Sequence, residues 1–140
     1  MATILVVDDD ENFRHMLELI LKKDGHGVLG AETGLDAIEL AGQEKSIDIV
    51  ITDQLMPGMT GTSLAKRLRL AAATRNAKIV VLSSSHLTPE VEAAILDSRI
   101  VAWLSKPIGL AELRAYILAL LAGDLEALNR IAGEGQDDAA

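Results

Sequence analysis

Two groups of carboxylates in this chain follow apolar segments of strand length. Asp53 comes directly after residues 47–52, and the run Asp8-Asp9-Asp10 comes directly after residues 4–7. If both segments are strands of one parallel sheet, three or four carboxylates converge at its carboxyl edge. Such a cluster repels itself unless a cation lies in it. Clustered carboxylate oxygens are ligands suited to Mg²⁺ or another divalent cation.

A hydroxyl and an ammonium group follow two further apolar segments. Ser83 comes after residues 79–82, and Lys106 comes after residues 103–105. In the same sheet these side chains would join the carboxylates and bind the oxygens of a phosphoryl group. A cation would bring that group close to an acid that otherwise repels it. The residue types therefore indicate phosphoryl transfer to an aspartate that acts as the nucleophile.

Five segments have the length and composition of β-strands. The first, third and fourth are apolar blocks without period-two alternation, which is typical of strands covered on both faces in a parallel sheet. The second is weaker, and we expect it at an edge of the sheet. The predicted strands are residues 3–7, 26–31, 47–52, 78–83 and 101–105.

The first predicted helix follows the run of three aspartates. Asp10 is expected to cap its N-terminus, and Gly25 to end it in the left-handed conformation. Its apolar residues recur at the spacing of one helical face, which predicts an amphipathic helix. These residues are Phe13, Met16, Leu17, Ile20 and Leu21.

Four more helical segments alternate with the remaining strands. Thr88, Pro89 and Glu90 are typical of a helix start, with a capping hydroxyl, a proline at the first position and an acid near the positive end. The last segment is rich in Leu and Ala. The predicted helices span about residues 34–43, about residues 62–72, a segment from residue 88 onward, and residues 110–122.

Five strand–helix repeats with short connections predict an α/β fold, a doubly wound five-stranded parallel sheet with helices on both faces. Ligands of such folds bind beyond the carboxyl ends of the strands, where the acids are expected. We assign residues 1–122 to this domain. Residues 123–140 contain five acidic residues against Arg130. We expect them to form an acidic C-terminal extension, partly helical and then flexible.

Composition excludes several classes of protein. The length of 140 residues suits one domain, and 49% apolar residues are too many for a disordered chain. The net charge of −8 argues against nonspecific binding to nucleic acid or anionic membrane. The absence of cysteine excludes disulfides and thiolate metal sites. No apolar window reaches the roughly 18–20 residues of a membrane span, and no secretory signal is evident, so we expect a cytoplasmic protein.

Four motifs in order make the chain resemble the receiver domains of two-component response regulators, particularly the single-domain chemotaxis-type regulators. Each motif lies at the end of its predicted strand, and the similarity covers about residues 2–122. The resemblance implies a flavodoxin-like fold with strand order 2-1-3-4-5. The motifs are residues 4–10, 53–61, 80–84 and 103–107.

The resemblance implies a metal-assisted phosphoacceptor site. Asp53 matches the phosphoacceptor. Asp8 and Asp9 match the acidic pair that binds Mg²⁺ (or Mn²⁺) together with Asp53, and Asp9 is expected to be the more direct ligand of the two. The backbone carbonyl of Gln54 is expected to complete the protein's share of the ligands.

The resemblance also assigns residues that respond to the phosphoryl group. Ser83 matches the switch hydroxyl, and Lys106 matches the lysine that contacts the acidic site and then the phosphate. In similar proteins the bond between this lysine and the following proline, here Pro107, is cis. Trp103 falls at the aromatic switch position, which is usually Tyr or Phe, and its larger size makes an inward swing sterically harder.

The implied function is that of a stand-alone switch rather than an enzyme. A histidine kinase or a histidine phosphotransfer protein is expected to phosphorylate Asp53, and the chain is expected to signal by contact with a downstream protein. No nucleic acid or membrane partner is expected. Homodimer formation through the fourth helix, fifth strand and fifth helix is open.

Two other functions are compatible with parts of the sequence pattern. A degenerate receiver would bind partners without being phosphorylated, although the retained acids, serine and lysine argue against it. A phosphohydrolase with an aspartyl-phosphate intermediate typically has an Asp-x-Asp motif at the nucleophile. Here Gln54 and Leu55 follow Asp53, so the second acid of that motif is missing.

Overall fold

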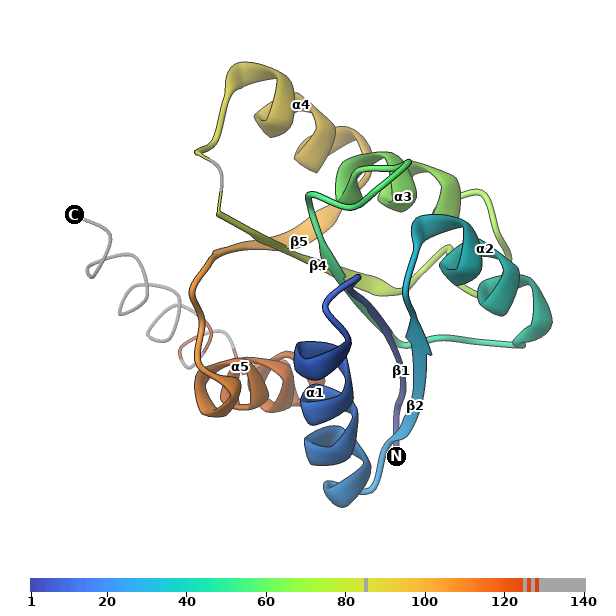
Figure 1. The fold of residues 1–140 in the computed structure, drawn as a ribbon, viewed down its shortest axis with the longest axis vertical. Helices are drawn as coiled ribbons and strands as arrows, with labels where there is room; N and C mark the ends of the chain where they lie inside the picture. The colour runs from blue at the N-terminus through green and yellow to red at the C-terminus, as the bar shows by residue number, and fades with distance from the viewer. Residues whose placement is uncertain (85, 125, 127, 129–140) are drawn as a thin grey trace.

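Strands and helices alternate along the whole of the described chain. The computed structural model describes residues 1–84, 86–124, 126 and 128. The strands are β1 (Thr3–Val7), β2 (Gly27–Ala31), β3 (Ile49–Asp53), β4 (Lys78–Ser83) and β5 (Ile100–Ser105). The helices are α1 (Glu11–Lys23), α2 (Gly34–Gln43), α3 (Gly61–Leu68), α4 (Pro89–Asp97) and α5 (Leu110–Ala122) (Figure 1).

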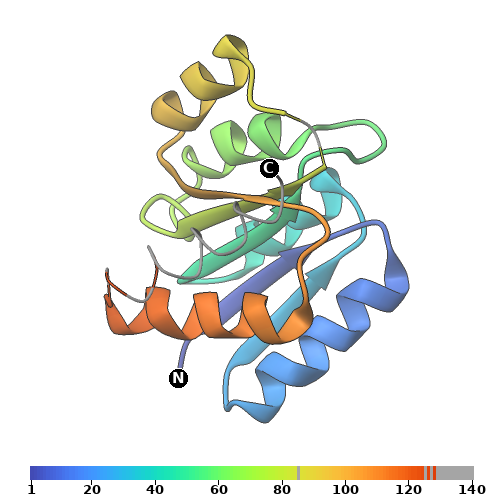
Figure 2. The same cartoon turned by 90° about the vertical axis from the view of Figure 1, so that its left-hand side faces the viewer.

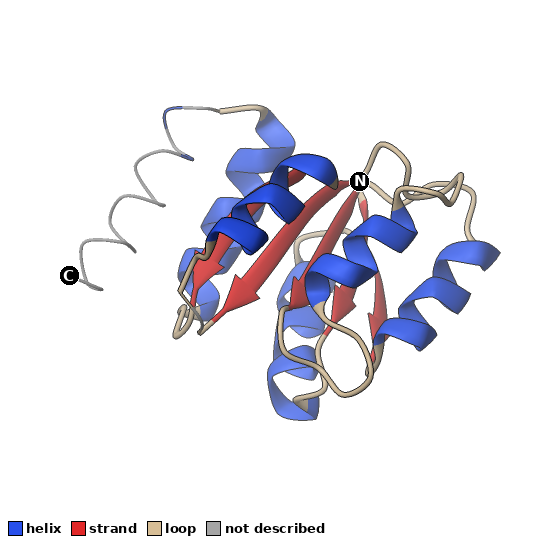
Figure 3. Ribbon diagram, turned by 90° about the horizontal axis from the view of Figure 1, so that it is seen from above, coloured by secondary structure: helices blue, strands red, loops and turns tan. Residues whose placement is uncertain are grey.

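The five strands form one parallel sheet in the order β2-β1-β3-β4-β5. This confirms the predicted doubly wound fold, and β2 lies at an edge as expected. Helices α1 and α5 cover one face of the sheet, while α2, α3 and α4 cover the other (Figures 2 and 3). Of the predicted acidic extension, residues 123–140, only residues 123, 124, 126 and 128 are among the described residues.

Each face of the sheet carries its own hydrophobic core. Successive residues of a strand point to opposite faces, so Ile4 and Val6 pack under α1 and α5, whereas Leu5 and Val7 pack under α2 and α3. The central strands β1, β3 and β4 are buried on both sides, which explains why their sequences are apolar blocks.

The residues at both ends of α1 agree with the prediction, but the buried face of the helix differs from the predicted one. Asp10 caps the helix by accepting hydrogen bonds from the Asn12 and Phe13 amides, and Gly25 follows the helix at φ 93°. Met16, predicted to lie on the buried stripe, is 54% exposed. The buried stripe is narrower than its sequence pattern, because a helix buries only the side chains that face the sheet, and in α1 these are Leu17 and Leu21.

Helix α3 ends at Leu68, four residues before its predicted end near residue 72. Arg69 is the C-cap residue, and the chain then turns tightly, with the Thr74 hydroxyl donating to the Leu68 carbonyl at 2.5 Å. A side-chain hydroxyl therefore satisfies a carbonyl that a longer helix would have bonded internally. The boundaries of the strands differ from the predicted ones by at most two residues.

Gly61, the first residue of α3, allows two backbone segments to approach closely. A Cβ atom at this position would lie 2.6 Å from the Asp53 carbonyl oxygen and 3.1 Å from Gln54 Oε1. The Gly61 amide donates to the Gln54 carbonyl at 2.9 Å. This contact fixes the start of α3 against the end of β3.

We predict that Gly61→Ala destabilises the protein by about 1–3 kcal/mol, because the added methyl group meets backbone atoms that cannot move aside cheaply. Gly42→Ala is the matched control, since a Cβ at Gly42 meets nothing within 4 Å. Inside α2 that change should stabilise by up to about 1 kcal/mol. Urea unfolding of both variants measures the difference, and equal midpoints would contradict the packing argument.

Helices α1 and α5 are joined by one bidentate ion pair. Arg114 Nε and Nη2 donate to the two carboxylate oxygens of Asp24 at 2.7 Å and 2.8 Å. This hydrogen bonding lowers the pKa of Asp24 from its ordinary value of 3.8. A carboxyl with a lowered pKa in the folded state stabilises the fold above its unfolded pKa and loses that contribution as the pH falls through the folded value.

We predict that Arg114→Gln lowers the melting temperature at neutral pH and that the difference from the parent chain shrinks as the pH falls below 3.8. Arg67→Gln is the control, because Arg67 is exposed and makes no ion pair within the described part of the chain. Thermal unfolding followed by circular dichroism over that pH range provides the measurement. A difference independent of pH would show that Arg114 acts by packing alone.

Candidate functional site

The carboxyl edge of the sheet gathers the predicted acidic residues. Asp53 ends β3, and Asp8 follows β1, the neighbouring strand. Asp8, Asp9 and Asp53 each offer an oxygen, and these atoms all lie within 4.8 Å of one another. The predicted convergence of carboxylates is therefore present in the structure.

Lys106 brings a positive charge to the same edge. Its Nζ lies 3.0 Å from Asp53 Oδ2 and 3.9 Å from Asp8 Oδ2. The Lys106 amide donates to the Ser83 carbonyl at 2.8 Å, which ties the turn after β5 to the end of β4. The bond between Lys106 and Pro107 is cis, as the resemblance implied.

The clustering of carboxylates makes ionisation of Asp8 less favourable, which its raised pKa shows. Its side chain is buried, and Oδ1 accepts the Asp10 amide at 2.9 Å. Burial raises the pKa of Asp8 most strongly, and the negative charges of Asp53 and Asp9 raise it further, whereas the Asp10 amide and Lys106 act in the opposite direction. Additional positive charge at this point would favour the ionised carboxylate.

The donor set fits a hard divalent cation. Three carboxylates supply the oxygen ligands that Mg²⁺ accepts, within a distance that one ion can span. Asp9 is exposed, and Asp53 is partly exposed. A cation held here would therefore retain water molecules, which is how Mg²⁺ usually binds to proteins.

Gln54 is held firmly in the loop between β3 and α3. Its Oε1 accepts the Thr62 amide at 2.9 Å, and its backbone carbonyl accepts the Gly61 amide at 2.9 Å. The predicted ligand role of the Gln54 carbonyl stays a prediction, and it would have to use the second lone pair of that oxygen. Leu55, the next residue, is exposed, and none of the residues described here donates to its carbonyl.

The two predicted switch residues lie on β4 and β5. Ser83 is buried at the end of β4, opposite Ser105 in the register. Trp103 lies opposite Val81 and packs, half-buried, on the core beneath α2 and α3. Both residues lie in the strands that the sequence predicted for them, but their switching roles stay predictions.

Three residues of the site were not singled out from the sequence. Lys106 Nζ lies 5.9 Å from the centroid of the Phe13 ring, and Arg14 Nη1 donates to the Asp8 carbonyl at 2.7 Å. The buried Thr52 hydroxyl donates to the Asp53 carbonyl at 3.0 Å. The position of Phe13 and Arg14 in the first turn of a helix that follows the acidic run is the only sequence signal for them.

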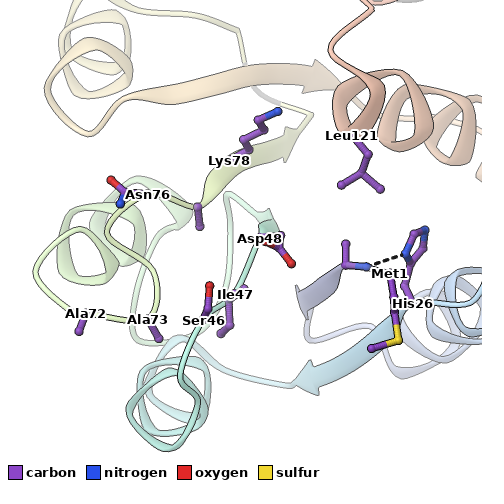
Figure 4. Close-up of a pocket in the computed structure, with 12 residues that line it drawn as sticks. Met1, His26, Ser46, Ile47, Asp48, Ala72, Ala73, Asn76, Lys78 and Leu121 are labelled. Atoms are coloured by element: carbon purple, nitrogen blue, oxygen red, sulfur yellow. Dashed lines mark hydrogen bonds between the residues drawn. The ribbon is translucent and has the colours of Figure 1, made fainter.

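One cavity lies beside the acidic cluster, and a larger one lies elsewhere. One of about 340 Å³ opens beside the acids and is lined by Phe13, Lys106 and Ile108. Another, of about 560 Å³, lies at the opposite edge of the sheet (Figure 4). There, Asp48 accepts the Thr3 amide and Lys78 donates to the Leu120 carbonyl. Because these charged groups already support the fold, the acidic edge is the better candidate site.

The fold and the acidic edge together define a receiver-type signalling domain. The family model described as the response regulator receiver domain matches residues 4–118. The chain therefore belongs to the response regulator receiver family. No helix in the described part of the chain is both long enough and apolar enough to cross a membrane.

Two relatives and one solved structure illustrate the similarity. Protein PilH of Pseudomonas aeruginosa is 36% identical over 124 residues, covering 88% of this chain and 100% of PilH. The sensory/regulatory protein RpfC of Xanthomonas campestris is 42% identical over 115 residues, covering 79% of this chain but only 15% of RpfC. The chemotaxis protein CheY4 of Vibrio cholerae has a TM-score of 0.75 and 29% identity, covering 84% of this chain and 97% of that one.

Proposed function

We propose that this chain is a phosphoacceptor switch in which Asp53 receives a phosphoryl group from a phosphohistidine. The donor would be a histidine kinase or a histidine phosphotransfer protein. The observation that carries the proposal is the ammonium of Lys106, 3.0 Å from an Asp53 oxygen inside a cluster of three carboxylates. Membership of the receiver family and the match to a sensory/regulatory protein support it.

The carboxylate of Asp53 is arranged to act as the nucleophile. Lys106 binds Oδ2, whereas Oδ1 accepts no hydrogen bond from the residues described and remains available to attack phosphorus. As the new O–P bond forms, the P–N bond of the donor breaks and the imidazole leaves. Lys106 would then bind a phosphoryl oxygen, and the Ser83 hydroxyl at the end of β4 would donate to another.

Mg²⁺ (or Mn²⁺) fits the same site. Asp8, Asp9 and Asp53 would hold it, with a backbone carbonyl from Gln54 or, since that of Gln54 already accepts the Gly61 amide, from Leu55. When bound, the cation neutralises charge that develops on the phosphoryl oxygens during transfer. Lys106 supplies a second positive charge, which contacts both Asp53 and Asp8.

The phosphoryl group would act through α4, β5 and α5. Helix α4 has no buried residue, so little packing energy opposes its movement. Leu87, Val101 and Leu118 are exposed hydrophobic side chains on or beside these elements. A phosphorylation-dependent contact with a partner protein, or a homodimer, would use this face, and Trp103 lies half-buried in β5 next to it.

The remaining expectations follow from this role. The chain would catalyse only its own phosphorylation and slow dephosphorylation, without turnover of an external substrate. Residues 1–122 would form the receiver unit and residues 123–140 an acidic extension. A cytoplasmic location and stand-alone action stay predictions.

We predict that Asp53→Asn abolishes labelling by radioactive acetyl phosphate in the presence of Mg²⁺, because an amide oxygen is too weak a nucleophile to form the acyl phosphate. Asp10→Asn is the matched control, since Asp10 caps α1 without belonging to the carboxylate cluster. Label retention is measured after gel filtration. Undiminished labelling of the Asp53 variant would show that Asp53 is not the phosphoacceptor.

The alternative function is a degenerate receiver that binds partners without phosphorylation. We expect Mg²⁺ alone, and Mg²⁺ with beryllofluoride, to change the fluorescence of Trp103, the single tryptophan of the chain. Such a change arises if an occupied acidic edge alters the packing of β5. Asp9→Asn should weaken the response because it removes one proposed ligand. The absence of any response in the parent chain would favour the alternative.

A further inference from the structure

One part of this acidic protein is entirely free of acidic residues. Between Asp53 and Glu90 the chain contains five basic residues and no Asp or Glu, although the whole chain has a net charge of −8. This segment includes α3 and the α3–β4 loop. The five residues are Lys66, Arg67, Arg69, Arg75 and Lys78.

Arg69 organises the end of this segment through carbonyl groups rather than acids. As the C-cap of α3 it donates to the carbonyls of Ser98 at 2.8 Å and Arg99 at 2.9 Å, which joins it to the end of α4. It also donates to the loop carbonyls of Thr74, Arg75 and Ala77 at 3.1, 3.0 and 2.6 Å. All the donor nitrogens of this guanidinium are therefore used in holding the loop and α4 together.

Arg75 and Arg99 remain exposed beside this junction. Arg99 Nη2 donates to the Arg75 carbonyl at 3.1 Å, and no carboxylate pairs with Arg69, Arg75 or Arg99 in the described part of the chain. Burial first, and then the charge of Arg99, lower the pKa of Arg69. The charges of Arg69 and Arg99 thus lie close enough to act on each other, and the backbone carbonyl of Arg75 binds both of their side chains.

The backbone at Arg99 is also unusual. It has a φ of 53°, and it is the one residue other than glycine with positive φ in the described chain. An arginine in the left-handed region has a strained backbone, and it persists there only where the surroundings hold it. Arg69 and Leu96 supply that support, since Arg69 binds the Arg99 carbonyl and the Arg99 amide donates to the Leu96 carbonyl.

Two large apolar side chains flank the same junction. Leu70 directly follows Arg69, and Leu96 lies in the last turn of α4. They are 78% and 79% exposed, more than any other large hydrophobic residue described apart from Met1. Two leucines this exposed, at a junction that also presents exposed arginines, combine apolar surface with positive charge, as interaction surfaces of proteins often do.

We propose that Leu70, Arg75, Leu96 and Arg99 form an arginine–leucine patch that binds an acidic, leucine-containing segment of a partner protein. Complementary charge selects such a segment, because Arg75 and Arg99 offer guanidinium donors that match carboxylates. Leu70 and Leu96 provide apolar surface that a nucleic acid backbone would not use. Two exposed arginines also neutralise too few phosphates for appreciable binding to nucleic acid.

The patch is separate from the phosphoacceptor site. It precedes β4 and β5 in the chain and so lies at the amino edge of the sheet, whereas Asp53 lies at the carboxyl edge. The hydrogen bonds of Arg69 hold the patch without any contribution from the acidic cluster. Binding at the patch is therefore expected to be unchanged in Asp53→Asn, so this proposal stands or falls separately from the phosphoacceptor role.

The test is a titration of the ¹⁵N-labelled full chain with a synthetic peptide of alternating Glu and Leu, followed by amide chemical shifts. We expect shifts concentrated at residues 69–76 and 96–100, and smaller shifts as salt is added. Arg75→Glu should weaken binding by about tenfold or more. Arg67→Glu is the matched control, because it makes the same charge change on the exposed face of α3 and lies in the same basic segment.

A second pair of variants separates charge from apolar contact. Leu96→Ser should also weaken binding, whereas Leu35→Ser, at a leucine of α2 that is 67% exposed, should not. Equal losses in Arg75→Glu and Arg67→Glu, shifts scattered over the surface, or equal binding of a peptide with Gln in place of Glu would each overturn the proposal. Equally tight binding of a short DNA duplex at the same amides would also overturn it, in favour of a nucleic acid surface.

Discussion

The mutual repulsion of carboxylates at one edge of the sheet is the constraint on which the rest of the structure depends. Asp8, Asp9 and Asp53 are held within reach of one cation because β1 and β3 are adjacent, parallel and buried on both faces. Only apolar strands can be buried in this way, so the charges are confined to the strand ends. Lys106, placed by the turn after β5, offsets part of the repulsion.

Charged side chains are stabilised differently at the two edges of the sheet. At the carboxyl edge, acids gather around Lys106 and a proposed cation. At the amino edge, Arg69 donates to backbone carbonyls that follow α4 and to carbonyls of the loop between α3 and β4. The dipole of α4 adds partial negative charge at its C-terminal end. Carbonyl groups stabilise a guanidinium without neutralising it, and the exposed arginines nearby, Arg75 and Arg99, form no ion pair with any of the described residues.

Features that depend on hydrophobic periodicity and on the residues at strand ends could be predicted from the sequence. Features that depend on hydrogen bonds between particular loop atoms could not. The strands, the sheet order and the convergence of Asp8, Asp53 and Lys106 follow from apolar blocks and family motifs. The early end of α3 could not be predicted, because it depends on bonds from Arg69 and Thr74 to particular carbonyls. For the same reason, the partner of the Gln54 carbonyl was not predictable, since Gly61 reaches it through the tertiary fold.

Helix α4 connects the two edges, and its attachments are unequal. Its C-terminal end is held by Arg69 through the Ser98 carbonyl. Its N-terminal end is capped by Thr88, and no side chain of another described element donates to it or accepts from it. No residue of the helix is buried, so these end contacts carry much of its positioning. A phosphoryl group at Asp53 would act nearest the weakly held end. We therefore expect α4 to pivot about the Arg69 contact, which would move the face made with β5 and α5 and leave the arginine–leucine patch in place.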